Sequence, residues 1–144
     1  QIKNFIEILI LASLVQKESN VYSDQQKVAR VLINRLKKGM KLQCDPTCVY
    51  GPERYKRKPS PKDCKDSNNR YSTYVIKGLP PSPIGNPSRN AIRAVRGPYN
   101  GLDAQKILFF VAKRDGSGTH HFSEVFGAHK KAIRKYLKRR KLRK

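Results

Sequence analysis

The sequence lacks a run of about 18 consecutive apolar residues, the length that a membrane-spanning helix needs. The longest apolar segment, Ile2–Val15, is shorter and contains Lys3 and Glu7. We therefore expect no membrane span in these residues. The chain starts at Gln1 and shows no signal peptide, so we expect a processed or truncated piece.

Acidic residues are scarce. Ten Asp and Glu stand against 32 Lys and Arg among 144 residues, which gives a formal net charge of +22. Apolar residues make up 38%, below the roughly 45–50% of typical globular chains, but they occur in blocks that can build a core. These values exclude an acidic binding protein and a wholly disordered chain. The length fits one domain, which we place at residues 1–129, followed by a basic helix end and tail at 130–144.

The excess of positive charge favours an anionic partner such as nucleic acid, anionic lipid or an acidic polymer. However, the sequence has neither zinc-finger spacing nor an RNA-binding module with stacking aromatic residues. We therefore favour a solvated basic surface over dedicated nucleic-acid binding. The tail, with ten basic residues and no acid in Lys130–Lys144, is expected to attach the chain to anionic surfaces.

Cysteine is also rare, and the odd count of three excludes a full disulfide framework. Cys44, Cys48 and Cys64, together with three histidines, do not have the spacing of a standard zinc site. We favour small buried thiols and leave a single disulfide open. There is no glycine-rich phosphate loop, because Gly116 and Gly118 fit a hairpin turn. We expect no metal and no cofactor.

Hydrophobic spacing, caps and breakers predict an α+β fold, with several helices packed on a small antiparallel sheet. The expected helices cover residues 2–18, 23–39, 61–66, 86–96 and a last stretch from Ser123 into the tail, with Ser23, Asn86 and Ser123 as caps. The expected strands cover residues 71–76, 107–112 and 119–122. Residues 40–61 are expected to form a long structured loop.

Glu18 is the acid best suited to chemistry. It follows Leu14 and Val15 at helical spacing, so it lies on the apolar face near the end of a buried helix. Apolar surroundings raise the pKa of a carboxyl group, as a general acid requires. A surface glutamate at a frayed helix end fits the spacing equally well. Glu7 lies roughly 16 Å away along such a helix, too far to form a pair, and the sequence does not place Asp45.

Short motifs are spread along nearly the whole chain in one order. They are Leu-Ala-Ser-Leu-Val-Gln-Lys-Glu at 11–18, Val-Leu-Ile-Asn-Arg-Leu at 31–36, Leu-Gln-Cys-Asp-Pro-Thr-Cys-Val-Tyr-Gly at 42–51, Tyr-Ser-Thr-Tyr at 71–74, Gly-Leu-Pro-Pro-Ser-Pro-Ile at 78–84, Asp-Gly-Ser-Gly at 115–118, and His120, Phe122 and His129. Together they resemble the motifs of the YceG-like group of endolytic murein transglycosylases. The segments 43–51 and 78–84 are the specific ones.

This resemblance implies a lytic transglycosylase that cleaves peptidoglycan glycan strands. One glutamate of the family's first helix motif is catalytic, and it falls on Glu18, while Gln16 stands where the family often has a second glutamate. Ser72 stands where the family usually has Asn. The substrate-binding side chains that the resemblance implies are Asn34, Gln43, Asp45, Thr47, Tyr50, Tyr71, Ser72 and Thr73.

The implied mechanism needs a single carboxyl group and no water. Glu18 protonates the glycosidic oxygen between N-acetylmuramic acid and N-acetylglucosamine, and then takes the proton of the muramoyl C6 hydroxyl as a 1,6-anhydro ring closes. The resemblance places the protein in the periplasm or on the outer face of the cytoplasmic membrane, with peptidoglycan synthases as partners. The family's membrane anchor and LysM-like domain have no counterpart in this sequence.

Two other functions remain open from the residues alone. One is a non-catalytic peptidoglycan-binding module that has kept the fold and lost the activity. The other is a basic nucleic-acid-binding protein, whose affinity would fall steeply with salt. Formation of an anhydro product separates the enzyme from both.

Overall fold

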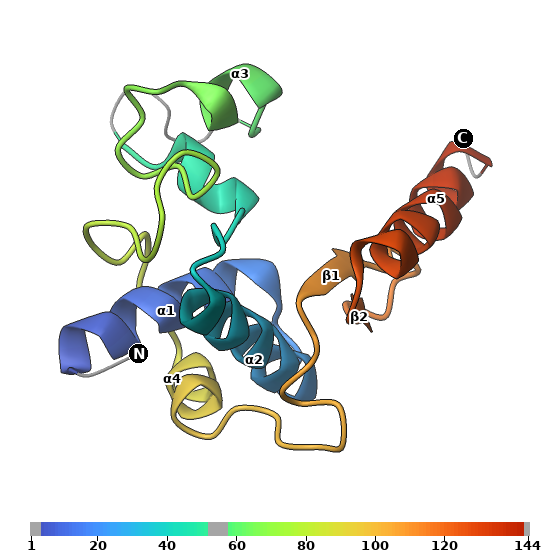
Figure 1. The fold of residues 1–144 in the computed structure, drawn as a ribbon, viewed down its shortest axis with the longest axis horizontal. Coiled ribbons are helices and arrows are strands. Elements are labelled where there is room, and N and C mark those ends of the chain that lie inside the picture. Colours follow the sequence, from blue (N-terminus) through green and yellow to red (C-terminus); the bar gives the residue numbers. More distant parts are fainter. Residues whose placement is uncertain (1–3, 52–57, 143–144) are drawn as a thin grey trace.

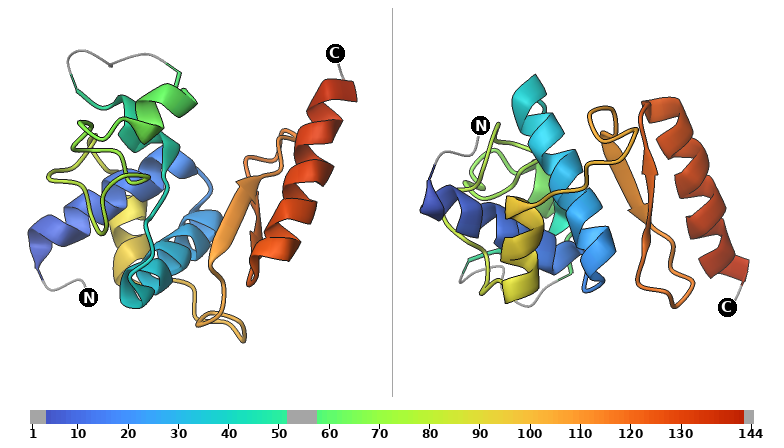
Figure 2. Two further views of the ribbon diagram at one scale, coloured as in Figure 1. Left: turned by 45° about the horizontal axis from the view of Figure 1, so that its top comes forward. Right: turned by 90° about the horizontal axis from the view of Figure 1, so that it is seen from below.

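A computed structural model describes residues 4–51 and 58–142. Helices α1 (Phe5–Glu18), α2 (Tyr22–Lys38) and α4 (Arg89–Arg96) pack together as a helical body. A hairpin of β1 (Phe109–Ala112) and β2 (His120–Ser123) stands beside this body with α5 (Phe126–Leu142) on its outer side (Figures 1 and 2). The α+β prediction is confirmed. None of the helices in these described ranges is long and apolar enough to cross a membrane.

Helix α1 is the central element of the core. Its first turn is capped by Asn4, whose side chain accepts a hydrogen bond from the backbone N of Glu7 at 2.9 Å. Every residue of Ile10–Val15 is buried. The predicted helix is thereby confirmed over its described part, while residues 1–3 lie outside the described ranges.

Helix α2 begins earlier than predicted. Val21 occupies the cap position without a side-chain hydrogen bond, and Ser23 lies inside the first turn, so the cap predicted at Ser23 is wrong. The reason is the tight link from α1, in which the hydroxyl of Ser19 accepts a hydrogen bond from the backbone N of Val21 at 3.1 Å. The predicted end is confirmed, because Gly39 adopts the left-handed conformation with φ of 69°.

The segment between α2 and α4 consists of turns around two short helices, the 3₁₀ helix η1 (Asp45–Val49) and α3 (Pro61–Lys65). The strand predicted at residues 71–76 is wrong. The carbonyl of Ser72 accepts hydrogen bonds from the backbone N atoms of Val75 and Ile76, each at 3.0 Å, so this backbone closes into turns instead of a ladder. Residues 52–57 of the predicted long loop lie outside the described ranges.

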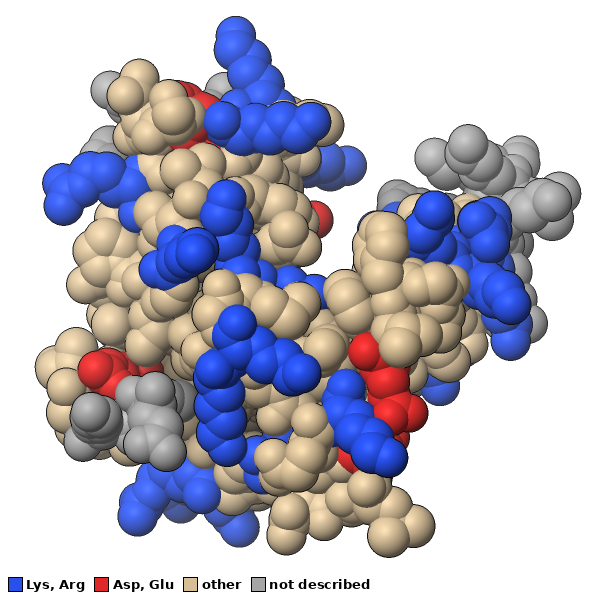
Figure 3. All heavy atoms as spheres, in the orientation of Figure 1, with Lys and Arg blue, Asp and Glu red and all other residues tan. Residues whose placement is uncertain are grey.

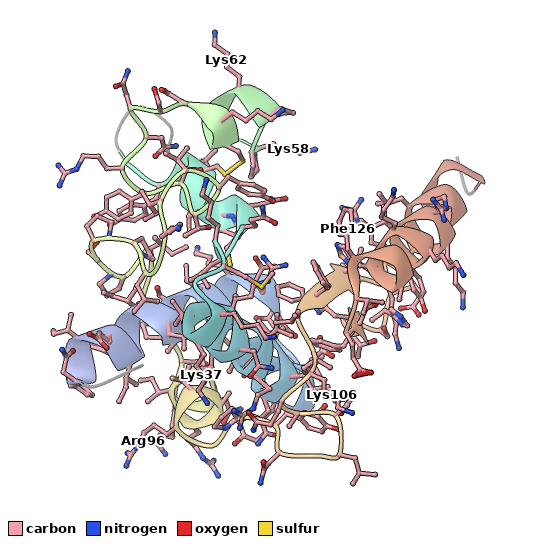
Figure 4. All side chains as sticks on the ribbon, in the orientation of Figure 1. Lys37, Lys58, Lys62, Arg96, Lys106 and Phe126 are labelled. Atoms are coloured by element: carbon pink, nitrogen blue, oxygen red, sulfur yellow. A yellow bond between two sulfur atoms is a disulfide. The ribbon has the colours of Figure 1, made fainter. Side chains whose placement is uncertain are left out.

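A disulfide joins Cys48 in η1 to Cys64 in α3, and its sulfur–sulfur bond lies close to α3 in Figure 4. The favoured interpretation of free thiols is therefore wrong for these two residues, and the single bridge left open is the one that forms. Cys44 remains a free, buried thiol. The spacing of the cysteines in the sequence could not distinguish free thiols from a disulfide, because the pairing depends on how η1 and α3 pack.

Two helix starts differ from those predicted. Helix α4 is capped by Ser88, whose hydroxyl accepts a hydrogen bond from the backbone N of Ala91 at 3.2 Å, rather than by Asn86. Helix α5 begins at Phe126 because Ser123 still belongs to β2, where it pairs with Phe109. The predicted hairpin is confirmed, with strands that differ slightly in length from those expected.

The hairpin is fastened to α2 near both ends of that helix. Near the C-terminal end, Arg35 donates a hydrogen bond from Nε to the carbonyl of Leu108 at 2.7 Å, and its guanidinium lies 5.0 Å from the ring centre of Phe109. Near the N-terminal end, the Asp24 carboxylate contacts Nδ1 of His120 at 2.5 Å. These two attachments hold the hairpin next to the C-terminal end of α1.

Candidate active site

Two cavities meet at Glu18. The first, of about 270 Å³, lies between the helical body and the hairpin, where the space-filling view shows a hollow (Figure 3). The second, of about 470 Å³, lies between the end of α1 and the turn that joins β1 to β2. Both are lined by Glu18, Ala112, Arg114 and His120. An extended ligand that runs through both would pass directly over the Glu18 carboxyl group.

The surroundings of the Glu18 carboxyl group move its pKa close to neutrality. Its side chain is partly buried at the last residue of α1, directly after the buried stretch that ends at Val15. Burial raises its pKa to about 7; the nearby His120 lowers this pKa and the negative charge of Asp45 raises it further. Both protonation states are therefore accessible near neutral pH, as a group that first donates and then accepts a proton requires.

Asp45, the first residue of η1, lines the first cavity together with Glu18. Its carboxylate accepts a hydrogen bond from the hydroxyl of Tyr74, which lines the same cavity. Burial and this hydrogen bond raise the pKa of Tyr74 above its ordinary value, so the phenol stays protonated. Asp45 is thus a fixed negative group facing the cavity that contains Glu18.

His120 and Asp24 form a buried pair behind Glu18. Their side chains are 8% and 6% exposed, and the 2.5 Å contact fixes Nδ1 of the imidazole on the carboxylate. The Phe110 ring meets the imidazole edge-on at 5.4 Å. His120 belongs to a motif that sequence reasoning noted without a role. Nothing local in the sequence links Asp24 to a histidine 96 positions away.

Arg35 and His129 also line the first cavity. Burial, followed by the positive charge of Arg35, lowers the pKa of His129, so its imidazole is neutral near pH 7. The ring stacks on Phe109 at 5.1 Å, and its Nδ1 has no hydrogen-bond partner among the described residues. Arg35 also donates to the carbonyl of Lys41 at 2.8 Å, which ties α2 to the loop that leads to Gln43.

Of the predicted substrate-binding residues, the structure brings Gln43 and Asp45 to the cavity that Glu18 lines. Both are exposed there. Gln43 also has a φ of 54°, a conformation that is rare for residues other than glycine. Arg114, which sequence reasoning missed, has a φ of 55° and lines both cavities. Within the described ranges these are the two non-glycine residues with positive φ, and such outliers cluster at functional sites.

The other predicted residues do not line the two cavities at Glu18. The Thr47 and Thr73 hydroxyls lie 2.9 Å apart in the interior, and Ser72 donates to the carbonyl of Cys64 at 2.6 Å. Asn34 donates to the carbonyls of Ala104 and Ile107, each at 2.8 Å. All four side chains are buried, so in this structure they hold the backbone.

The predicted tyrosines also lie apart from these two cavities. Tyr50 and Tyr71 are partly buried and pack against each other with ring centres 4.7 Å apart. The Tyr71 hydroxyl lies 2.7 Å from that of Ser82. Contact of a substrate with these two rings, or with the four buried side chains, stays a prediction.

In residues 4–51 and 58–142, no group of three or more His, Cys, Asp or Glu is placed to hold a metal ion. The fold and the site together define a class: an α+β fold with a cavity lined by one glutamate whose pKa is raised to about 7.

The chain belongs to the YceG-like family, whose family model matches residues 1–135. It is 36% identical over 131 residues to an endolytic murein transglycosylase of Bacillus subtilis strain 168, a match that covers 91% of this chain and 34% of the relative. It is 34% identical over 92 residues to an endolytic murein transglycosylase of Streptococcus pneumoniae strain D39, covering 61% of this chain and 17% of the relative.

The fold is also similar to that of a known structure. The crystal structure of a YceG-like protein from Listeria monocytogenes matches with a TM-score of 0.74 and 35% identity, over 86% of this chain and 38% of that one. The motif resemblance is therefore confirmed at the level of the family and the fold. The chain spans 34% of the length of the Bacillus relative.

Proposed function

We propose that this chain is the catalytic part of an endolytic peptidoglycan lytic transglycosylase, with Glu18 as its acid and base. The names of the Bacillus and Streptococcus relatives support peptidoglycan as the substrate. The observation that carries the proposal is the position of Glu18, on the shared border of two cavities and with a pKa of about 7.

In the first step, the protonated Glu18 carboxyl donates its proton to the glycosidic oxygen between N-acetylmuramic acid and N-acetylglucosamine. The bond from the muramoyl C1 to this oxygen breaks, and the leaving sugar departs as an alcohol. The muramoyl C1 becomes positively charged. The new Glu18 carboxylate and Asp45 stabilise this charge, because both line the first cavity.

In the second step, the Glu18 carboxylate takes the proton from the C6 hydroxyl of the same muramoyl residue. The C6 oxygen bonds to C1 and closes the 1,6-anhydro ring, which returns Glu18 to its protonated state. One carboxyl group therefore completes the cycle. The site does not need the second carboxylate, at a set distance from the first, that ordinary glycosidases require. Gln43 and Asp45 orient sugar hydroxyl and N-acetyl groups.

The setting of the reaction is part of the same proposal. Glycan strands are the substrate, the periplasm or the outer face of the cytoplasmic membrane is the location, and peptidoglycan synthases are candidate partners. The Lys and Arg side chains scattered over the visible surface suit the carboxylates that muropeptides carry (Figure 3).

The test replaces Glu18 by Gln, which keeps the shape and the hydrogen-bonding capacity but removes the transferable proton. General acid–base contributions are about 10²–10⁴-fold, and here one group has both roles, so anhydro-muropeptide release should fall by at least that factor. The Glu7→Gln variant is the control, because Glu7 lies near the other end of α1 and does not line either cavity at Glu18. Asp45→Asn should reduce the rate by less than Glu18→Gln.

Release of anhydro-muropeptide at the wild-type rate by a folded Glu18→Gln protein would overturn the proposal. A wild-type protein that binds peptidoglycan but releases no product would instead favour the non-catalytic binding module. Circular dichroism on each variant separates loss of chemistry from loss of folding.

A further inference from the structure

The second cavity contains cationic groups that the proton transfers at Glu18 do not use. We propose that Arg114, together with Lys17, which lines the same cavity, forms a subsite that binds a carboxylate attached to the muramoyl residue of the substrate. The inference rests on the proposed function and adds a residue that sets substrate preference. Arg114 is assigned to binding and not to proton transfer.

The side chains that line the second cavity carry more positive than negative charge. Lys17 lies near the end of α1, and Arg114 projects from the turn between β1 and β2. Glu18 is the single acid among the residues that line the cavity, and it lies on the border shared with the first cavity. Asp115 is next to Arg114 in the chain, but its carboxylate accepts hydrogen bonds from the backbone N and the hydroxyl of Ser117, at 3.0 and 2.5 Å.

The backbone conformation of Arg114 is unfavourable, which points to a functional role for this residue. Its φ of 55° lies in the left-handed region, which glycine and asparagine adopt more readily than arginine. The same turn places glycines at positive φ at Gly116 and Gly118. The Arg114 guanidinium is exposed and, among the described residues, forms no hydrogen bond or ion pair that would offset the strain. An unfavourable conformation with no internal compensation points to a ligand.

The guanidinium group defines the chemistry of that ligand. Its planar donors match a carboxylate through two parallel hydrogen bonds, a geometry that lysine cannot reproduce. On a glycan strand the muramoyl residue is the one that carries carboxyl groups. These are the carboxylates of the peptide stem when the peptide is present, and the lactyl carboxylate when it has been removed. Because cleavage occurs at Glu18, a neighbouring muramoyl residue places such a group within the cavity that Glu18 borders.

The test compares three substrates and four proteins. The substrates are glycan strands with peptide stems, the same strands after their carboxyl groups are converted to amides, and strands stripped of peptide by an amidase. The proteins are the wild type, Arg114→Gly, Arg114→Lys and the control Arg89→Ala. Arg89 is exposed on α4 and lines neither cavity at Glu18, so the control removes one positive charge from elsewhere on the surface.

The wild type should prefer carboxylate-bearing strands over amidated ones in kcat/KM. Arg114→Gly should lower this preference about five- to tenfold, mainly through KM, and Arg114→Lys should retain part of it. The thermal midpoint of Arg114→Gly should equal or exceed that of the wild type, because glycine relieves the strained φ. Added salt should also lower the preference of the wild type for carboxylate-bearing strands, because it screens the charges involved. Arg89→Ala should keep the wild-type preference.

A kcat/KM that Arg114→Gly leaves unchanged on both the intact and the stripped strands would overturn the subsite, as would a lowered midpoint with equal losses on all three substrates, which marks a structural role. If the effect of Arg114 appears on the intact strands, the stem carboxylates are the ligand; if it appears only on the stripped strands, the lactyl group is. Absence of anhydro product from the wild type on all three substrates would instead refute the proposed function itself.

Discussion

At the scale of single residues, the proposed mechanism makes the protonation of Glu18 set the pH range in which the site can act. Burial moves its pKa from the ordinary value of 4.5 to about 7. The first proton transfer needs the protonated form, which predominates below this pKa and is lost as the pH rises through it. The carboxylate needed for the second transfer is produced by the first, so it does not have to exist in the free enzyme.

The predicted pH profile of kcat/KM is therefore a plateau below about pH 7 and a tenfold fall for each unit above it. Asp45→Asn should move the falling limb to lower pH, because the negative charge of Asp45 raises the pKa of Glu18. Initial rates at low substrate concentration between about pH 5 and 9 measure both the plateau and the falling limb. A rate that rises through pH 7 would mean that the free enzyme needs the carboxylate, contrary to the proposed first step.

At the scale of elements, the disulfide between η1 and α3 supports the wall that carries Asp45. Because Asp45 is the first residue of η1, the bridge at Cys48 restrains the segment that presents this carboxylate to the cavity. The two cysteines are 16 positions apart, and closing a loop of about this length contributes about 3 kcal/mol in the chain-entropy model.

Reduction of the bridge should lower the free energy of unfolding by about 2–3 kcal/mol and lower the thermal midpoint. Non-reduced protein in denaturant should show one reactive thiol, that of Cys44, and Cys44→Ala should show none. Thiol titration and thermal melts with and without reductant measure these values. Three reactive thiols in non-reduced protein would show that the bridge does not form.

The elements also show which parts of the fold a sequence can predict. The apolar run before Glu18 and the glycine at position 39 act locally, so the buried α1 and the end of α2 were predicted correctly. The segment at residues 71–76 has strand-forming residues, but its backbone closes on Ser72, whose hydroxyl is held by the carbonyl of Cys64. A tertiary hydrogen bond thus outweighed local propensity.

The same limit applies to the site. Glu18, Gln43 and Asp45 were predicted from motifs and the structure brings them together. Thr47, Thr73 and Asn34 were expected to bind substrate because they are polar residues within the motifs, yet each is buried and hydrogen-bonded to a group at least 26 positions away in the chain; Thr47 also donates to the nearby carbonyl of Cys44. A motif identifies which residues matter, but not whether a side chain faces the cavity or holds the backbone behind it.

At the scale of the whole molecule, basic residues occur along the entire chain and are most frequent in its last fifteen residues, Lys130–Lys144. Helix α5 continues to Leu142, so most of the basic segment is helical rather than an irregular tail. Arg143 and Lys144 lie outside the described residues. The expected role of this segment is attachment to anionic surfaces.

Deletion of residues 139–144 should weaken binding to vesicles that contain anionic phospholipid, mainly at low salt, where the screening length is long. Turnover of short soluble glycans should stay at the wild-type value, because the proposed chemistry is carried by Glu18 at the end of α1 and Asp45 at the start of η1. Vesicle sedimentation at about 0.01 and 0.15 M salt, beside a turnover assay, separates the two effects. A collapse of turnover would place the segment in the site.

The central claim is that Glu18 closes an anhydro ring without the help of water. Mass spectrometry of the products formed by the wild-type protein in water enriched in oxygen-18 tests this claim most directly. We predict muropeptides that end in 1,6-anhydro rings and carry no oxygen-18 from the solvent. Products with a free reducing end labelled by oxygen-18 would contradict the claim, because they would show hydrolysis and would require a second group, with Asp45 as the first candidate, to activate water.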